Sequence, residues 1–154
     1  MKIQLIYMSA ATRPLDYEEL LALLMKARLT NDSLDITGML VYHEDSFLQI
    51  LEGEETDVED LYERIHNDPR HTHCALLHRS PISHRSFSDW NMGFLYTGHE
   101  ELKTIPGFYD FFEENFSRES FLADPTLSRT LLLMFRDGRW HQTISSLAGE
   151  PALA

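Results

Sequence analysis

Apolar and polar positions alternate at the start of the chain and then change to a helical period. Residues Lys2–Ser9 place every second side chain on the same side, which is typical of a β-strand. A stripe with the i, i+3, i+4, i+7 spacing follows and predicts a helix with one buried face. Asp16 and Glu19 come directly before this stripe at the spacing of a capping box, so they predict where the helix begins. The stripe consists of Leu20, Leu23, Leu24 and Ala27.

The next part of the chain returns to a pattern typical of strands. Short polar residues at Asn31–Asp35 predict the end of the first helix. The β-rich runs Thr37–His43 and Ser46–Glu52 are separated by only two residues. This arrangement predicts a hairpin.

A second helix and two more strands complete the pattern. Thr56 and Glu59 have the spacing of another capping box and predict a helix that begins near residue 56. Strands are expected at His73–Arg79 and Trp90–Tyr96. The order strand, helix, strand, strand, helix, strand, strand predicts an α+β fold, namely a ferredoxin-like (βαββαββ) sheet with two helices on one face.

Residues 98–154 differ from this pattern and predict a C-terminal extension of two short helices and a tail, outside a domain formed by residues 1–97. We expect the extension to pack on the sheet or on a partner chain. The apolar positions of its first helix are Phe108, Phe111, Phe112 and Phe116. Its second helix is capped by Asp124 and Pro125, with Leu127, Leu131, Met134 and Phe135 on one face.

Composition narrows the possible functions. The 25 acidic and 13 basic side chains give a net charge of −12, the wrong sign for binding nucleic acid or an anionic membrane. No run approaches the ~18 apolar residues of a membrane span and no leader is evident, so we expect a cytoplasmic protein. The single Cys74 predicts a buried thiol, and His71 and His73 lack the spacing of a metal site. No nucleophile elbow, P-loop or dinucleotide motif is present.

Several polar or flexible side chains do not fit a plain core. Tyr7 and Gln49 lie on apolar strand faces, where each polar tip needs a hydrogen-bond partner. They could bond to each other in a core, Gln49 could face solvent, or both could serve a ligand. Asn31 could be a turn or cap residue or an amide that contacts a flat polar ligand. Trp90 and Met92 could be packing residues or a mobile gate.

Five segments of the sequence form a further pattern, namely Leu5–Ser9, Ala27–Leu40, Phe47–Glu54, Arg64–His71 and Phe87–Phe94. Together they resemble the BLUF family of blue-light receptors, which bind flavin adenine dinucleotide (FAD). The resemblance covers residues 1 to about 97, and the extension is similar to the tails of short, stand-alone members. Thr30 departs from the Asn or His that many members carry at that position.

The resemblance implies roles for individual residues around a flavin held between the two helices. Tyr7 would be the electron donor and Gln49 the amide that bridges this phenol to the flavin, with a proton following through Gln49, whose amide is left rotated or tautomerised. The remaining residues implied to contact the cofactor are Asn31, Thr30, Arg64, Asp68, Arg70, His71, Leu24, Phe47 and Ile65. Those implied to transmit the signal are Trp90, Met92 and Ser9.

The expected function is therefore a blue-light photoreceptor that turns over no substrate. It would signal to an unidentified partner protein through the last strand and the C-terminal helices, as a homo-dimer or higher homo-oligomer without a metal. The alternatives are a flavin-dependent oxidoreductase or small ferredoxin-like enzyme, and a colourless dimeric module whose phenylalanine stripe at Phe108–Phe116 is an interface.

Overall fold

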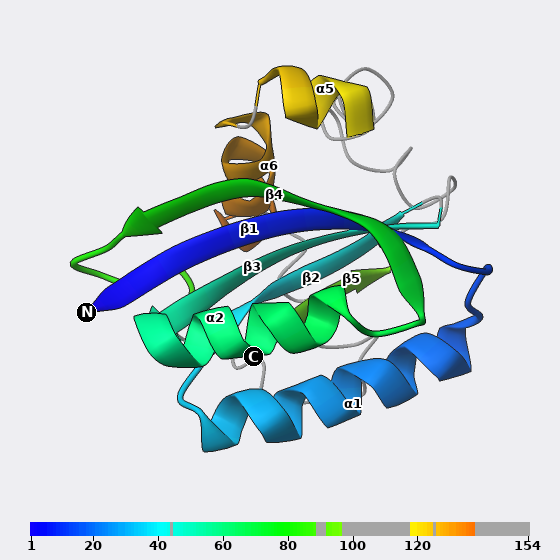
Figure 1. The fold of residues 1–154 in the computed structure, drawn as a ribbon, viewed down its shortest axis with the longest axis horizontal. Helices are drawn as coiled ribbons and strands as arrows, with labels where there is room; N and C mark the ends of the chain where they lie inside the picture. The colour runs from blue at the N-terminus through cyan, green and yellow to red at the C-terminus, as the bar shows by residue number, and fades with distance from the viewer. Residues whose placement is uncertain (44, 89–91, 97–117, 125, 138–154) are drawn as a thin grey trace.

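A computed structural model describes residues 1–43, 45–88, 92–96, 118–124 and 126–137 (Figure 1). The first seven elements follow the predicted βαββαββ order, and two helices come after them. The elements are β1 (Lys2–Ala11), α1 (Tyr17–Ser33), β2 (Thr37–His43), β3 (Ser46–Glu54), α2 (Glu55–His66), β4 (His71–Pro81), β5 (Gly93–Tyr96), α5 (Arg118–Ala123) and α6 (Thr126–Asp137).

The five strands form one sheet in the order β4-β1-β3-β2-β5. β4, β1, β3 and β2 pair antiparallel, as in a ferredoxin-like fold, and β5 adds parallel to β2 at the edge. In the register of β1 and β3, Tyr7 lies directly opposite Gln49. The predicted fold is confirmed, and the two polar strand residues are neighbours in it.

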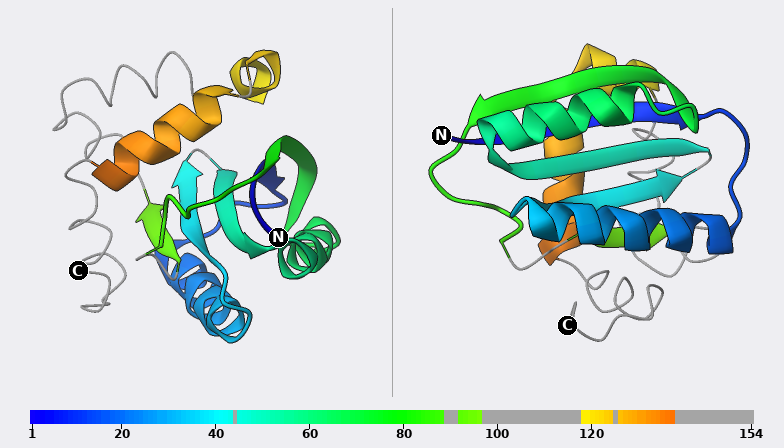
Figure 2. Two further views of the ribbon diagram at one scale, coloured as in Figure 1. Left: turned by 90° about the vertical axis from the view of Figure 1, so that its left-hand side faces the viewer. Right: turned by 60° about the horizontal axis from the view of Figure 1, so that its bottom comes forward.

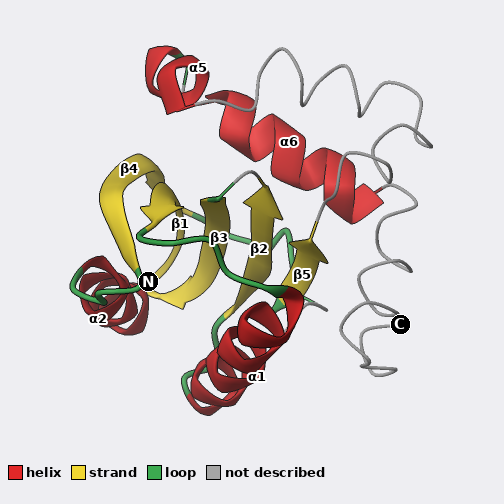
Figure 3. Ribbon diagram, turned by 90° about the vertical axis from the view of Figure 1, so that its right-hand side faces the viewer, coloured by secondary structure: helices red, strands yellow, loops and turns green. Residues whose placement is uncertain are grey.

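The helices lie on both faces of the sheet. α1 and α2 run along one face, with β3 and β2 visible between them (Figure 2), and α6 crosses the opposite face (Figure 3). The central strands are therefore covered on both sides, and every residue from Ile3 to Ser9 is buried. Among the described residues, no helix is long and apolar enough to span a membrane.

Of the two capping boxes predicted from the sequence, the structure contains only the first. The capping box of α1 is present, because the Asp16 carboxylate accepts a hydrogen bond from the Glu19 N–H at 2.8 Å. The box predicted from Thr56 and Glu59 is wrong, since α2 begins at Glu55 directly after β3 and its N-cap residue makes no side-chain cap bond. Glu59 instead pairs with Arg79 of β4. An ion pair to the neighbouring strand has taken the place of the local cap.

The C-terminal part confirms one predicted helix and adds another. α6 corresponds to the helix expected after Asp124, and its Leu131 and Leu132 are buried. α5 was not predicted, although its Phe121 is fully buried. The helix expected at Phe108–Phe116 lies outside the described residues.

The last predicted strand is shorter than expected. β5 begins at Gly93, so Met92 comes just before the strand and not within it, and Trp90 is outside the described part of the chain. The side chain of Met92 is nevertheless fully buried.

Gly38 is required by the close contact between β2 and β3. A Cβ atom at this position would lie 1.9 Å from the carbonyl oxygen of Ile50, which belongs to the backbone and cannot move aside. We expect Gly38→Ala to lower the free energy of unfolding by about 2 kcal/mol or more, measured by denaturant titration. Gly53→Ala is the matched control, because its new Cβ would meet Ile36 Cγ1 at 3.1 Å and cause a smaller loss. Equal losses in both variants would contradict this explanation.

Candidate functional site

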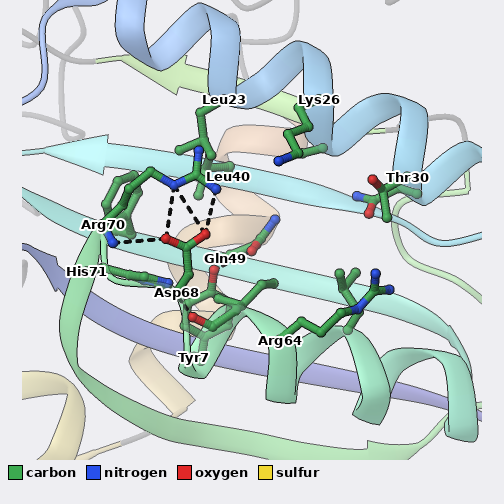
Figure 4. Close-up of a pocket in the computed structure, with 15 residues that line it drawn as sticks. Tyr7, Leu23, Lys26, Thr30, Leu40, Gln49, Arg64, Asp68, Arg70 and His71 are labelled. Carbon is green, nitrogen blue, oxygen red and sulfur yellow. Dashed lines mark hydrogen bonds and ion pairs between the residues drawn. The ribbon is translucent and has the colours of Figure 1, made fainter.

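A cavity of about 240 Å³ lies between α1 and α2 above the middle of the sheet (Figure 4). Its apolar walls come from both helices and from the strands beneath them, which suits a flat, largely apolar ligand. The residues of these walls are Leu23, Ala27, Leu40, Phe47, Leu61 and Ile65.

The floor of the cavity carries the hydrogen-bonded pair Tyr7 and Gln49. The Tyr7 hydroxyl donates to Gln49 Oε1 at 2.5 Å, and the two side chains are only 3% and 4% exposed. Gln49 Nε2 in turn donates to the sulfur of Met92 at 3.4 Å. Gln49 therefore faces the cavity and connects a phenol on β1 to the residue that precedes β5.

The surroundings of Tyr7 keep its hydroxyl protonated. Burial raises the pKa of Tyr7 well above its ordinary value, and the nearby Cys74 and Tyr62 act in the same direction. The Tyr62 ring lies 5.4 Å from the Tyr7 ring, centroid to centroid. A neutral phenol that donates to a carbonyl oxygen is the state that this environment favours.

Asn31 places a buried donor at the cavity. α1 continues to Ser33, two residues beyond the predicted end of the helix, so Asn31 lies in its last turn. The side chain is 2% exposed, and its Nδ2 has no hydrogen-bond partner within the described part of the chain. Since buried donors in proteins are nearly always paired, this amide points to a ligand acceptor in the cavity.

The mouth of the cavity is rich in cationic groups. Asp68 and Arg70 form an ion pair at 2.5 Å, which holds the pKa of Asp68 at about 2, chiefly through the hydrogen bond from Arg70. Lys26 of α1 and Arg64 of α2 lie on opposite sides of the opening, and neither forms a hydrogen bond or ion pair with another described residue (Figure 4). In a chain of net charge −12, two uncompensated cations at one opening favour an anionic ligand group.

His71 joins the cavity to β1 and α2. Its Nε2 lies 2.5 Å from the carbonyl oxygen of Ile65, so this nitrogen carries the proton and donates. Its Nδ1 then accepts from the hydroxyl of Ser9, which is 2.8 Å away and buried. Ser9 thus supports a cavity residue and does not line the cavity itself.

Met92 is held from two sides. Its sulfur contacts Gln49, and its carbonyl oxygen accepts a hydrogen bond from Arg28 Nε of α1 at 3.0 Å. The buried Met92 and Ser9 are therefore in contact with the site, whereas Trp90 lies outside the described residues.

Most residues named from the sequence gather around this one cavity. They are Tyr7, Gln49, Asn31, Thr30, Arg64, Asp68, Arg70, His71, Phe47 and Ile65. Leu24 is an exception, because it is fully buried and does not line the cavity. On the same helix Leu23 and Ala27 do so instead.

Five residues that line the cavity were not predicted from the sequence, although their positions relative to predicted residues indicate that they lie nearby. Lys26 precedes Thr30 by one helical turn, and Leu61 precedes Ile65 by one turn. Leu40 lies opposite Gln49 in the register of β2 and β3. Leu23 and Ala27 belonged to the apolar stripe that predicted α1.

The contacts of His71 predict a pH dependence of stability. Burial lowers the pKa of His71 below its ordinary 6.5, with smaller opposing effects from Ile65 and Asp68. Below about pH 6.5 the unfolded chain binds a proton that the folded chain does not, so the free energy of unfolding falls as the pH decreases. The loss between about pH 7.5 and about pH 5.5, from urea titrations, should be smaller in His71→Gln.

His78 provides a comparison, because burial and the charge of Arg129 lower its pKa as well. His78→Gln should therefore also reduce the loss of unfolding free energy at low pH, by the amount that His78 contributes. An unchanged pH profile in His71→Gln would contradict the assigned neutral state of His71.

Curated relatives with similar sequences are much longer than this chain. The photoactivated adenylate cyclase subunit beta of Euglena longa is 37% identical over 107 residues, which are 69% of this chain and 12% of the relative. The subunit alpha of Euglena gracilis is 33% identical over 108 residues, 66% of this chain and 11% of the relative. The chain thus spans about a tenth of their length, and their whole-protein activity does not follow from the match.

Solved structures of shorter proteins match over most of their length. The ground state of BlsA superposes with a TM-score of 0.69 at 30% identity, covering 87% of this chain and 89% of BlsA. The dark state of BlrB, described as a BLUF protein, gives a TM-score of 0.67 at 27% identity and covers 85% and 95% of the two chains.

A family model described as "Sensors of blue-light using FAD" matches residues 3–93. This stretch contains the whole floor of the cavity, both helices that form its walls and the cations at its mouth. The family is one of light sensors, and its description names FAD. The chain belongs to the BLUF family of blue-light sensors.

Proposed function

We propose that this chain is a photosensory switch that binds FAD between α1 and α2, with Tyr7 and Gln49 as its photoactive pair. The observation that carries the proposal is the donor on Asn31, which is buried at the cavity and has no hydrogen-bond partner among the described residues. The polar edge of a flavin ring offers the carbonyl acceptor that this amide lacks. Lys26 and Arg64 at the mouth would contact the phosphate arm.

The bound flavin would supply blue-light absorption and a redox-active ring, and the chain's own residues would set the hydrogen bonds around it. Tyr7 is a neutral phenol, which can release an electron and a proton. Its proton lies on the hydrogen bond to Gln49 Oε1. Gln49 carries an acceptor and a donor at one tip, so turning the amide exchanges the two groups without moving the strand.

Met92 would report the orientation of this amide. In the structure its sulfur accepts the Gln49 N–H at 3.4 Å. After the amide turns, a carbonyl oxygen faces a sulfur that has no proton to donate, and the contact is lost. The side chain of Met92 can then move, because methionine is unbranched and flexible.

Several narrower parts of the proposal extend beyond the family. We propose that the chain turns over no substrate and that it signals to a partner protein, which the sequence does not identify. FAD, and not a shorter flavin, is favoured by Lys26 and Arg64 at the mouth, which form no ion pair with any residue that the structure describes. A cytoplasmic location, a homo-oligomer and a chain that acts without a metal or nucleic acid stay predictions from the sequence.

Absorption spectroscopy of the purified full chain tests the proposal. Protein loaded with FAD should shift its flavin absorption slightly to the red under blue light and recover in darkness. Mass spectrometry of the extracted cofactor should identify FAD. A chain that cannot be loaded with flavin would contradict the switch and favour the colourless dimeric module. A chain whose flavin bleaches while it oxidises a substrate would contradict the switch and favour the oxidoreductase.

Tyr7→Phe tests the photoactive pair. The variant removes the donor to Gln49 and should abolish the light-induced red shift while FAD stays bound. Its free energy of unfolding should fall by about 1–3 kcal/mol, because the buried Gln49 Oε1 loses its donor. Tyr62→Phe is the matched control, because this ring packs near Tyr7 but does not bond Gln49, and it should keep the shift. Loss of the shift in both variants, or in neither, would count against the assignment.

Asn31→Leu tests the ligand donor through two effects of opposite sign. Without flavin the variant should be as stable as the wild type or more stable by about 1 kcal/mol, because it removes an unsatisfied buried amide. With flavin its affinity for FAD should fall roughly tenfold, measured by fluorescence titration. Asn67→Ala, at the exposed C-cap of α2, should leave that affinity unchanged. An unaltered affinity in Asn31→Leu would remove the main support for the proposed orientation.

A further inference from the structure

The face of the sheet opposite the cavity carries a buried polar pair that the photoactive contacts do not use. Gln4 of β1 and Glu52 of β3 are cross-strand partners, and they are 1% and 0% exposed. Gln4 Nε2 donates to Glu52 Oε2 at 2.8 Å. Gln4 precedes Tyr7 by three residues and Glu52 follows Gln49 by three, so each lies on the opposite face from its photoactive neighbour.

Glu52 holds the backbone of the chain that leads to Met92. Its Oε1 accepts the N–H of Phe87 at 2.8 Å, and its Oε2 accepts the N–H of Ser86 at 3.0 Å. A buried carboxylate requires such partners, and its hydrogen bonds are stronger than those between neutral groups. Met92 follows Phe87 by five residues in the sequence. Glu52 therefore holds the backbone at Ser86 and Phe87, a few residues before Met92 in the sequence.

Gln4 extends this connection to α6. Its Oε1 accepts a hydrogen bond from Arg129 Nε at 3.1 Å, while its Nε2 is used by Glu52. The orientation of the amide is fixed by both ends, because reversing it would place an NH₂ group against the guanidinium and an oxygen against the carboxylate. Arg129 belongs to α6, the helix that crosses this face of the sheet (Figure 3).

We propose that Glu52, Gln4 and Arg129 form a hydrogen-bonded relay that couples the segment before Met92 to the docking of α6. The relay rests on the proposed photosensory function, and it would carry the light-induced change across the sheet to α6. Displacement of the Ser86 and Phe87 backbone weakens their bonds to Glu52. Gln4 is shared between Glu52 and Arg129, so a shift of the carboxylate changes the contact that holds α6. These three are positioning residues and do not touch the cavity.

Amide hydrogen exchange of the full chain loaded with FAD tests the relay. In the wild type, exchange of the α6 amides should differ between darkness and blue light. Arg129→Met should lose most of this difference while keeping the flavin red shift and its recovery, because Arg129 is a largely exposed residue of α6. Thr130→Met is the matched control: Thr130 is the exposed neighbour, its hydroxyl bonds only within the helix to Thr126, and it should keep both signals.

A second variant and the spectrum separate the possible outcomes. Gln4→Met removes the shared amide at similar volume and should abolish the α6 difference as well. If Gln4→Met does not fold, Arg129→Met decides alone. An α6 difference that persists in Arg129→Met, or no difference in the wild type despite a red shift, overturns the relay. A wild type without the red shift contradicts the proposed function itself, and the relay with it.

Discussion

The structure depends on satisfying polar groups that are buried in the middle of a sheet covered on both faces. The bond from the Tyr7 hydroxyl to Gln49 Oε1 is the central case, since both side chains are almost inaccessible to water. It requires the β1–β3 register that places the two residues opposite each other. In the same sheet β2 pairs with β3, and the two strands approach closely at Gly38. Among the described residues, the buried Asn31 Nδ2 is a donor that has no such partner.

A single amide is too small to act alone as a switch. One rearranged hydrogen bond changes the free energy by about 1 kcal/mol net, whereas moving a population from 1:99 to 99:1 requires about 5.5 kcal/mol. The additional energy must come from packed elements that respond together. Met92 is suited to this task, because its sulfur contacts Gln49, its backbone is held by Arg28, and its side chain is fully buried. Gln49 would start the change and the surroundings of Met92 would enlarge it.

Much of the fold and of the site could be predicted from the sequence, because periodicity and turn residues are local signals. The hairpin of β2 and β3 and the cap at Asp16 are examples. The start of α2 could not be predicted in this way, since Glu59 pairs with Arg79, twenty residues away. Lys26 was missed because its role depends on facing Arg64 across the cavity. The hydrogen bond between Gln4 and Arg129 could not be predicted from local sequence patterns either, because 125 residues separate the two.

In the proposed mechanism, light changes the hydrogen bonds of one side chain, the Gln49 amide. The most direct measurement is the light-minus-dark infrared difference spectrum of the FAD-loaded chain with ¹³C-labelled glutamine. We expect a shifted side-chain carbonyl band that moves with the label and disappears in Gln49→Leu. A difference spectrum whose bands are insensitive to the label and unchanged in Gln49→Leu would contradict the account.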